Sequence, residues 1–454
     1  MAHSIQTGNS VPYLGSTRTF TPAPILQPVS NPPLPQESVS LTGQPWPQPE
    51  VVAEKKAPPS QPEEKPVGVP VPATLLMEGP APESAETRQQ SALAGSLVQH
   101  FATSLQQNPK ALAALEKWPH QQRAKLDDLI RDNSLERSFL HQGPHTPTKA
   151  MGLLPELIAS GRLLDKDKTG KTTLDHLREI QEQPLEGNFQ AGVVVSELLA
   201  NLHNPGEINQ RNRGTCTVTT IEYFHASQQP SDYARLVKEL VRSEGKAHFQ
   251  TGQVCWTNPT GLGEDSSGRS SVDRIYQSSM MQAAYKGIAL YNNHNDTFWT
   301  RGWTRQFRDS GLFSHQSGYL MEQVLGKPTQ VMEYEGNRQR FEADMLRALN
   351  LGQTVFVAMA WHPDPQDRDS NHALAVEKIE NGKVYLRNPW GDGEKGGDNG
   401  PPRELVDDKG RVVVSQDDFF AHLKGAIRPE RNFFNVWANR IRYHLQGEAG
   451  ILKG

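Results

Sequence analysis

Apolar positions between residues 83 and 201 follow a helical spacing. Leu93, Leu97, Phe101 and Leu105 recur at four-residue steps, and the segments KALAALEKW and AKLDDLIRD continue the pattern. Residues four apart lie on one face of an α-helix, so this spacing predicts amphipathic helices that bury one side. We expect four to six such helices, which together form a helical segment over residues 83–200.

Helical and strand patterns alternate after residue 201. TVFVAMAW at residues 354–361 predicts a buried strand, and HALAVEKIENGKVYLRNPWG at residues 372–391 predicts a β-hairpin. Helices followed by strands favour an α+β fold for residues 201–454. PSDYARLVKELVRSE predicts a capped helix whose apolar face carries Tyr233, Leu236, Val237, Leu240 and Val241.

The first 82 residues have a different composition, with 18 of the 34 prolines and few apolar residues at any regular period. Such a segment buries too little apolar surface to offset the entropy lost on ordering. We therefore expect residues 1–82 to form a disordered, proline-rich tail. The Pro-Pro-Leu-Pro stretch at residues 32–35 makes a partner with an aromatic groove possible, although a plain spacer fits the composition better.

Charge and composition exclude several classes of protein. The net charge of -4 and the pI near 6.4 do not fit a nucleic-acid or anionic-membrane binder, which needs a basic excess. No apolar run is long enough to span a membrane, and the first 20 residues lack the pattern of a Sec-type signal peptide. Two cysteines are too few for a disulfide framework. We expect a cytoplasmic chain, or one exported without a Sec signal.

The segment DKDKTGKTTLDH resembles half of a calcium-binding EF-hand loop. Asp165, Asp167, Thr169 and Gly170 occupy positions one, three, five and six, but position twelve is His176 rather than the bidentate glutamate. A helix–turn–helix connection without calcium fits better, and calcium binding stays the alternative.

Cys216 is the candidate nucleophile. It begins an apolar-patterned run, Thr217 to Phe224, and a thiolate is stabilised by a helix N-terminus and a nearby imidazolium. Gln210 lies six residues earlier, and Gly214 permits a tight turn, so an amide donor can reach back toward the thiol and hold an oxyanion. The β-branched residues after Cys216 weaken the helix prediction on propensity.

His372 and Asn388 are the candidate base and its orienting group, because they lie on the two strands of the predicted hairpin. A two-residue Asn381-Gly382 turn would put them on opposite faces. A three-residue loop from Glu380 to Gly382 pairs Leu374 with Asn388 and puts His372 and Asn388 on one face. This register also gathers Leu374, Val376, Val384 and Leu386 on that face and leaves Arg387 on the other, so we predict it.

The motifs QRNRGTC, NHALAV and LRNPWG, in this order, resemble those of papain-like cysteine peptidases, and RNPWG followed by VVVSQDDFFAHL is most similar to the calpain catalytic core. The resemblance covers about residues 190–443 and implies a two-lobed fold, with substrate between a helical and a β-rich lobe. It implies Cys216 as nucleophile, His372 as base and acid, and Asn388 as the orienting group. It also implies Gln210 in the oxyanion hole and Trp390 as a shield over the Asn–His hydrogen bond.

Thr217 departs from the family pattern, in which a tryptophan follows the nucleophile. Cys255 precedes a tryptophan, but it has Phe249 where an amide donor is needed. No cluster of histidines or cysteines has the spacing of a metal site, so we expect no required cofactor.

We expect a cysteine endopeptidase with a protein or peptide as substrate, and helices 83–200 as an inhibitory or docking region. The alternatives are another acyl-transfer enzyme on this fold (a deamidase, a transglutaminase-like enzyme or an amide hydrolase) and a non-catalytic papain-like binding module.

Overall fold

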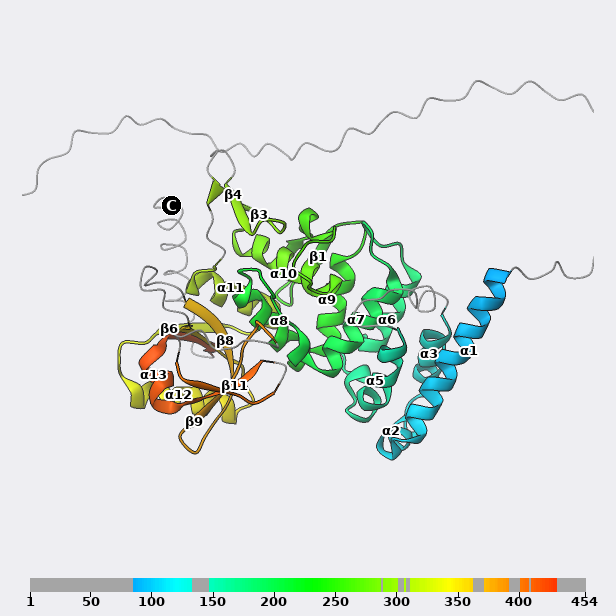
Figure 1. Cartoon of the computed structure of the whole chain (residues 1–454), viewed down its shortest axis with the longest axis horizontal. Helices are drawn as coiled ribbons and strands as arrows, with labels where there is room; N and C mark the ends of the chain where they lie inside the picture. The colour runs from blue at the N-terminus through cyan, green and yellow to red at the C-terminus, as the bar shows by residue number, and fades with distance from the viewer. Residues whose placement is uncertain are drawn as a thin grey trace, which may run out of the picture. The chain divides into compact units, whose positions relative to one another are not determined.

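The computed structural model describes residues 85–132, 147–286, 289–300, 306–307, 311–361, 371–391, 401–407 and 410–430. All of them belong to the second of two compact units, Glu78–Gly454. The proline-rich tail predicted for residues 1–82 lies outside the described residues. The described chain is a mixed α and β protein, as predicted, with helices first and a seven-stranded sheet later in the sequence (Figure 1).

The helices predicted for residues 83–200 are present. Leu97 and Phe101, two of the four apolar positions that predicted them, are buried. In the described part of this segment the α-helices are α1 (Ala85–Gln106), α2 (Pro109–Glu116), α3 (His120–Arg131), α5 (Pro147–Ala159), α6 (Thr173–Glu182) and α7 (Ala191–His203).

The segment that resembles an EF-hand connects the short 3₁₀ turn at Arg162–Leu164 to α6. The Asp167 carboxylate accepts hydrogen bonds from the backbone N–H groups of Thr169 and Lys171, and its other oxygen lies 2.9 Å from His176 Nε2. Thr172 caps α6, and its side chain and that of Asp175 form a reciprocal capping box. Backbone N–H groups of the loop itself and the His176 side chain therefore occupy the Asp167 carboxylate.

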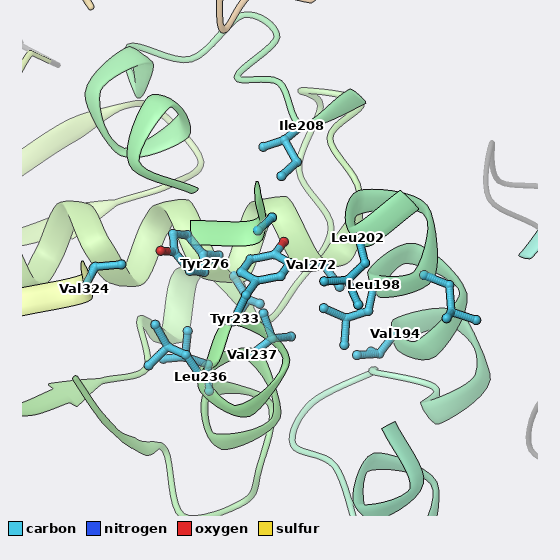
Figure 2. Close-up of a cluster of buried hydrophobic side chains, with 14 of the residues drawn as sticks. Val194, Leu198, Leu202, Ile208, Tyr233, Leu236, Val237, Val272, Tyr276 and Val324 are labelled. Atoms are coloured by element: carbon cyan, nitrogen blue, oxygen red, sulfur yellow. The ribbon is translucent and has the colours of Figure 1, made fainter. Parts of the chain in front are cut away.

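A second group of helices packs against the first. Its members are α8 (Cys216–Gln228), α9 (Pro230–Leu240), α10 (Ser271–Ala284) and α11 (Ser314–Leu325). The apolar face predicted for residues 230–244 is completely or almost completely buried along α9 and just beyond it. One continuous core joins both helical groups, and Figure 2 shows its centre, with Val194, Leu198 and Leu202 of α7 beside Tyr233 and Val237 of α9. The core therefore does not divide near residue 200.

Arg162 fixes the ends of two helices at once. Its guanidinium donates to Leu202 O in the last turn of α7, at 2.8 Å, and to Ala226 O and Ser227 O in the last turn of α8, both at 3.0 Å. The last carbonyls of a helix lack partners within the helix, and a cation near them is favourable. One side chain from the first helical group therefore completes a helix in each group.

The seven-stranded sheet is antiparallel, in the order β10-β11-β9-β8-β7-β12-β6. Its face away from α8 has a separate core with α12 (Arg338–Asn350) and α13 (Gln416–His422). Its strands are β6 (Thr329–Glu333), β7 (Val355–Ala360), β8 (Asn371–Glu380), β9 (Lys383–Arg387), β10 (Arg403–Leu405), β11 (Arg411–Ser415) and β12 (Leu423–Pro429). The small sheets are β1 (Lys246–His248) with β2 (Val254–Trp256), and β3 (Ala289–Asn292), β4 (Thr297–Thr300) and β5 (Gln306–Phe307).

The hairpin of β8 and β9 has the predicted register at one end and a different turn at the other. Ala375 lies opposite Arg387, so the next step pairs Leu374 with Asn388. The predicted three-residue loop is wrong: Asn381 and Gly382 form a two-residue turn, with φ of 52° and 72°. This pair of positive values is typical of a type I′ turn.

A β-bulge at Glu377 restores the register. Val376 pairs with Leu386, whereas Lys378 pairs with Tyr385, so Glu377 is an extra residue in β8. Its carboxylate accepts from Tyr223 of α8 at 2.7 Å and from Arg411 of β11 at 2.5 Å. The four apolar residues assigned to one face do share the core on that face.

Within the described ranges, every helix is too short or too polar to cross a bilayer.

Candidate active site

Helix α8 begins at Cys216, and it forms despite its β-branched residues because tertiary packing outweighs their low propensity. Val218, Ile221 and Phe224 enter the core, as predicted. On the other side α8 lies on β8, and Thr220 Oγ1 is 3.4 Å from Ala373 O (Figure 1). The packing thus puts the first residue of α8 beside the strand that carries His372.

The half-buried Cys216 thiol lies within hydrogen-bonding reach of two backbone N–H groups, those of Ala373 and Thr217. Burial raises the pKa of Cys216 above its ordinary value, and these two N–H groups oppose the shift because they stabilise the thiolate. The carboxylate of Asp296 also favours the neutral thiol. Ala373 directly follows His372, so the sulfur is adjacent to the start of β8.

The imidazole of His372 is buried and oriented. Its Nε2 lies 2.7 Å from Asn388 Oδ1, and that oxygen also accepts from the Trp390 backbone N–H at 3.1 Å. The Trp390 ring covers the imidazole, with centroids 4.3 Å apart, and Trp361 packs at 5.9 Å. Since Nε2 faces Asn388, the other ring nitrogen, Nδ1, is the one that lies away from Asn388.

Gln210 is anchored at the loop that precedes α8. Its backbone N–H donates to Pro389 O at 2.8 Å, which ties this loop to the residue after Asn388. Its side-chain Nε2 donates to Arg213 O at 2.5 Å, and its Oε1 is buried without a partner among the described residues. An amide nitrogen carries two hydrogens, so one N–H remains for a ligand.

Gly214 is held by an ion-dipole contact rather than by unusual backbone angles. Its N–H donates to Asp296 Oδ2 at 2.7 Å, and Tyr291 OH donates to Asp296 Oδ1 at 2.7 Å. The left-handed residue of this loop is Arg211, with φ of 52°. The prediction that Gly214 permits a tight turn stays a prediction, and the residue with a positive φ in this loop is Arg211.

Cys255 is placed differently from Cys216. It lies in the centre of β2, opposite Ala247, and only 1% of it is exposed. Burial raises the pKa of Cys255 to about 12. It therefore has the environment of a structural thiol.

The sequence patterns missed a set of buried polar side chains beneath α8. Glu222 accepts from Tyr233 OH and from Gln277 Nε2, at 2.9 and 3.0 Å, and burial raises the pKa of Glu222 well above its usual range. Burial also raises the pKa of Asp273 to about 6. Glu222 and Asp273 lie at buried positions of α8 and α10, and a polar residue at a core position of a helix is the signal that could have found them.

Among the described residues, no three histidine, cysteine, aspartate or glutamate side chains are grouped so that they could hold a metal ion. No family model matches this chain, and no curated protein matches its sequence.

Proposed function

We propose that this chain is a papain-like cysteine peptidase that hydrolyses peptide bonds, with the calpain catalytic core as its closest type. The observation that carries the proposal is the 2.7 Å contact between His372 Nε2 and Asn388 Oδ1 under the Trp390 ring, with the Cys216 sulfur beside Ala373. A nucleophile, a base and an orienting group within one constellation are what acyl transfer requires.

The two sides of the site fit the lobes of a papain-like fold. Cys216 and Gln210 come from α8 and the loop before it, whereas His372 and Asn388 come from the antiparallel sheet. In this proposal the substrate lies where these two sides meet.

The proposed reaction starts with transfer of the Cys216 proton to His372. The thiolate attacks the carbonyl carbon of the peptide, and the oxyanion accepts hydrogen bonds from the Cys216 backbone N–H and from the second N–H of Gln210 Nε2. The tetrahedral adduct collapses, the C–N bond breaks, and His372 gives its proton to the leaving amine. His372 then takes a proton from water as the water oxygen attacks the thioester carbon. The second adduct collapses, the C–S bond breaks, His372 returns the proton to the sulfur, and the product acid leaves and loses its proton to solvent.

One observation favours a second function, that of a non-catalytic binding module with this fold. Burial raises the pKa of Cys216, and Asp296 acts in the same direction, so the isolated thiol prefers its neutral form. A peptidase must overcome this preference with the positive charge that develops on His372. A binding module has no such requirement, and Cys216 then behaves as an ordinary buried thiol.

The rate of Cys216 alkylation by iodoacetamide, followed by peptide mapping from pH 4 to pH 10, separates the two functions. A peptidase should show labelling of Cys216 that persists below the ordinary thiol pKa of about 8.5. Labelling in this range should fall in His372→Ala, because the imidazolium partner is gone. His248→Ala, at a half-exposed histidine of β1, should label like the wild type.

The labelling rate of Cys255 in the same molecule is the internal reference for an unreactive thiol. If Cys216 shows only the pH dependence of an ordinary thiol, and His372→Ala leaves its rate unchanged, the peptidase proposal is wrong and the binding module is supported. If labelling is fast, cleavage of peptide libraries by the wild type but not by Cys216→Ala identifies the substrate class.

A further inference from the structure

Gln277 on α10 is completely buried and lies beneath the loop that leads into α8. Its Oε1 accepts from Thr215 Oγ1 at 3.0 Å, and its Nε2 donates to Asn209 O at 3.1 Å. Asn209 directly precedes Gln210, and Thr215 directly precedes Cys216. One side-chain amide therefore contacts the residue before the oxyanion-hole glutamine and the residue before the nucleophile.

The amide group of Gln277 is itself held by further partners. Its Oε1 accepts a second hydrogen bond from Arg269 at 3.1 Å, and its Nε2 donates a second one to Glu222 at 3.0 Å. Both hydrogens and both lone pairs of the amide are thus used, so its orientation is determined. Glu222 receives a bond from Tyr233, and Arg269 pairs with Asp265, so the partners are fixed as well.

Two side chains of α10 bind both backbone polar groups of Asn209, its N–H and its C=O. The Asp273 carboxylate accepts a hydrogen bond from the Asn209 backbone N–H, while Gln277 donates to the Asn209 carbonyl. Residues 273 and 277 are one helical turn apart, so they lie on the same face of α10. This face of α10 is a rigid support for the first residue of the loop.

We propose that Gln277 is a positioning residue, which sets the distance between Gln210 and the Cys216 backbone N–H and thereby forms the oxyanion hole. The inference rests on the proposed function. An oxyanion donor acts only when it lies about 2.7–3.1 Å from the developing charge, and a displacement of about 1 Å can cost about 10²-fold in rate. Gln277 has no direct contact with the thiol in this arrangement, so it acts on the hole and not on the nucleophile.

Two reagents separate the oxyanion hole from the thiol. p-Nitrophenyl acetate acylates Cys216 through a tetrahedral oxyanion, forming a thioester and releasing p-nitrophenolate. Iodoacetamide alkylates the same sulfur by displacement of iodide at a saturated carbon, with no oxyanion. The ratio of the two rate constants therefore reports the oxyanion hole, and it requires no knowledge of the natural substrate.

Gln277→Met keeps an unbranched side chain of similar length and removes all four hydrogen bonds. It should lower the acylation rate of Cys216 by about 10- to 100-fold, less than the roughly 10²- to 10³-fold cost of removing one oxyanion donor outright, and change alkylation by less than about threefold. Thr215→Val is a milder second variant that removes the hydroxyl bond to Gln277 together with the 3.4 Å contact between the hydroxyls of Thr215 and Thr219, and it should lower the ratio in the same direction.

Gln323→Met is the matched control. Gln323 is a buried glutamine on α11 whose side chain accepts from Thr251, away from the loop of residues 209–215. Its acylation-to-alkylation ratio should equal that of the wild type, although its melting temperature falls.

A lower melting temperature in Gln277→Met with an unchanged ratio overturns the positioning role, and so does an equal fall of the ratio in Gln323→Met. Failure of the proposed function looks different, because it appears in the wild type. There, Cys216 would react with both reagents like an ordinary thiol.

Discussion

One side-chain oxygen of Asn388 accepts two hydrogen bonds. Oδ1 accepts from His372 Nε2 and from the Trp390 backbone N–H, while its Nδ2 is buried without a partner among the described residues. An unpartnered buried donor costs about 1–3 kcal/mol. The acceptor, rather than the amide as a whole, is therefore what this position supplies to His372.

Replacement of Asn388 tests whether its acceptor oxygen is the part of the side chain that orients His372. Asn388→Ala should lower acylation of Cys216 by about 10²-fold, the size expected when a general base loses its orientation. Asn388→Asp keeps the acceptor and adds a charge that stabilises the imidazolium, so it should retain more activity and move the basic limb of the pH–rate profile to higher pH. The measurement is acylation by p-nitrophenyl acetate from pH 5 to pH 10. A loss as large in Asn388→Asp as in Asn388→Ala would contradict this role.

At this scale the sequence located the candidate nucleophile, base and orienting group because short motifs carry them. It did not locate Gln277, which is 61 residues from Cys216 in the chain and contacts the loop only after α10 has packed beneath α8. It also did not show the left-handed conformation of Arg211, since a positive φ at a non-glycine residue depends on tertiary contacts.

At the scale of elements, the hairpin of β8 and β9 has two irregularities whose effects on the strand register cancel. The Asn-Gly turn shifts the pairing by one residue, and the bulge at Glu377 shifts it back. The hydrophobic pattern predicted the register near His372, because a slip of one residue would turn the apolar face away from the core. The pattern cannot distinguish a longer loop from a short turn with a bulge, since both give the same pairing there.

The N-terminus of α10 is held by a buried carboxylate of α7. Glu197 Oε2 accepts from the Val272 backbone N–H at 3.0 Å, and Ser271 N–H also donates to this carboxylate. Desolvation outweighs these bonds and raises the pKa of Glu197 to about 7. The native state therefore holds a proton that the unfolded state releases near its ordinary pKa of about 4.3.

This difference makes stability depend on pH. A raised native pKa contributes stability that is full below about pH 4 and is lost as the pH rises through about 7. Between pH 4 and pH 8, the free energy of unfolding of the wild type should fall relative to Glu197→Gln by about 3 kcal/mol. Urea titrations at each pH measure it. Glu116→Gln, on the exposed side of α2, is the control, and parallel curves for wild type and Glu197→Gln would refute the expectation.

At the scale of the whole molecule, the described helices between residues 85 and 203 share one core with the helices of the candidate site. Val194, Leu198 and Leu202 of α7 are completely buried against α9 and α10 (Figure 2). The sequence predicted these helices as a helical segment over residues 83–200, whose inhibitory or docking role stays a prediction, but it did not predict the shared core. Helical spacing shows which face of a helix is buried, but not which partner covers that face.

A chain that begins at residue 204 should therefore fail to fold cooperatively. Helix α7 alone buries six leucine and valine side chains. At about 1.5–3 kcal/mol each, their loss of about 9–18 kcal/mol is as large as the 5–15 kcal/mol by which domains are stable. Thermal unfolding followed by circular dichroism measures this, with a chain that begins at Glu78 as the control. A sharp transition in the shorter chain would mean that residues 204–454 form an independent domain.

The guanidinium of Arg162 has a consequence for the time course of folding. It reaches carbonyls 40, 64 and 65 residues further along the chain, at the C-terminal ends of α7 and α8. Contacts between residues so distant in sequence require the closure of long loops, and a high proportion of them slows folding. The carbonyls in the last turn of α8 thus gain the hydrogen bonds from Arg162 only after an earlier part of the chain has docked. We therefore expect the C-terminal end of the helix that carries Cys216 to become stable late in folding, together with the packing of the two helical groups.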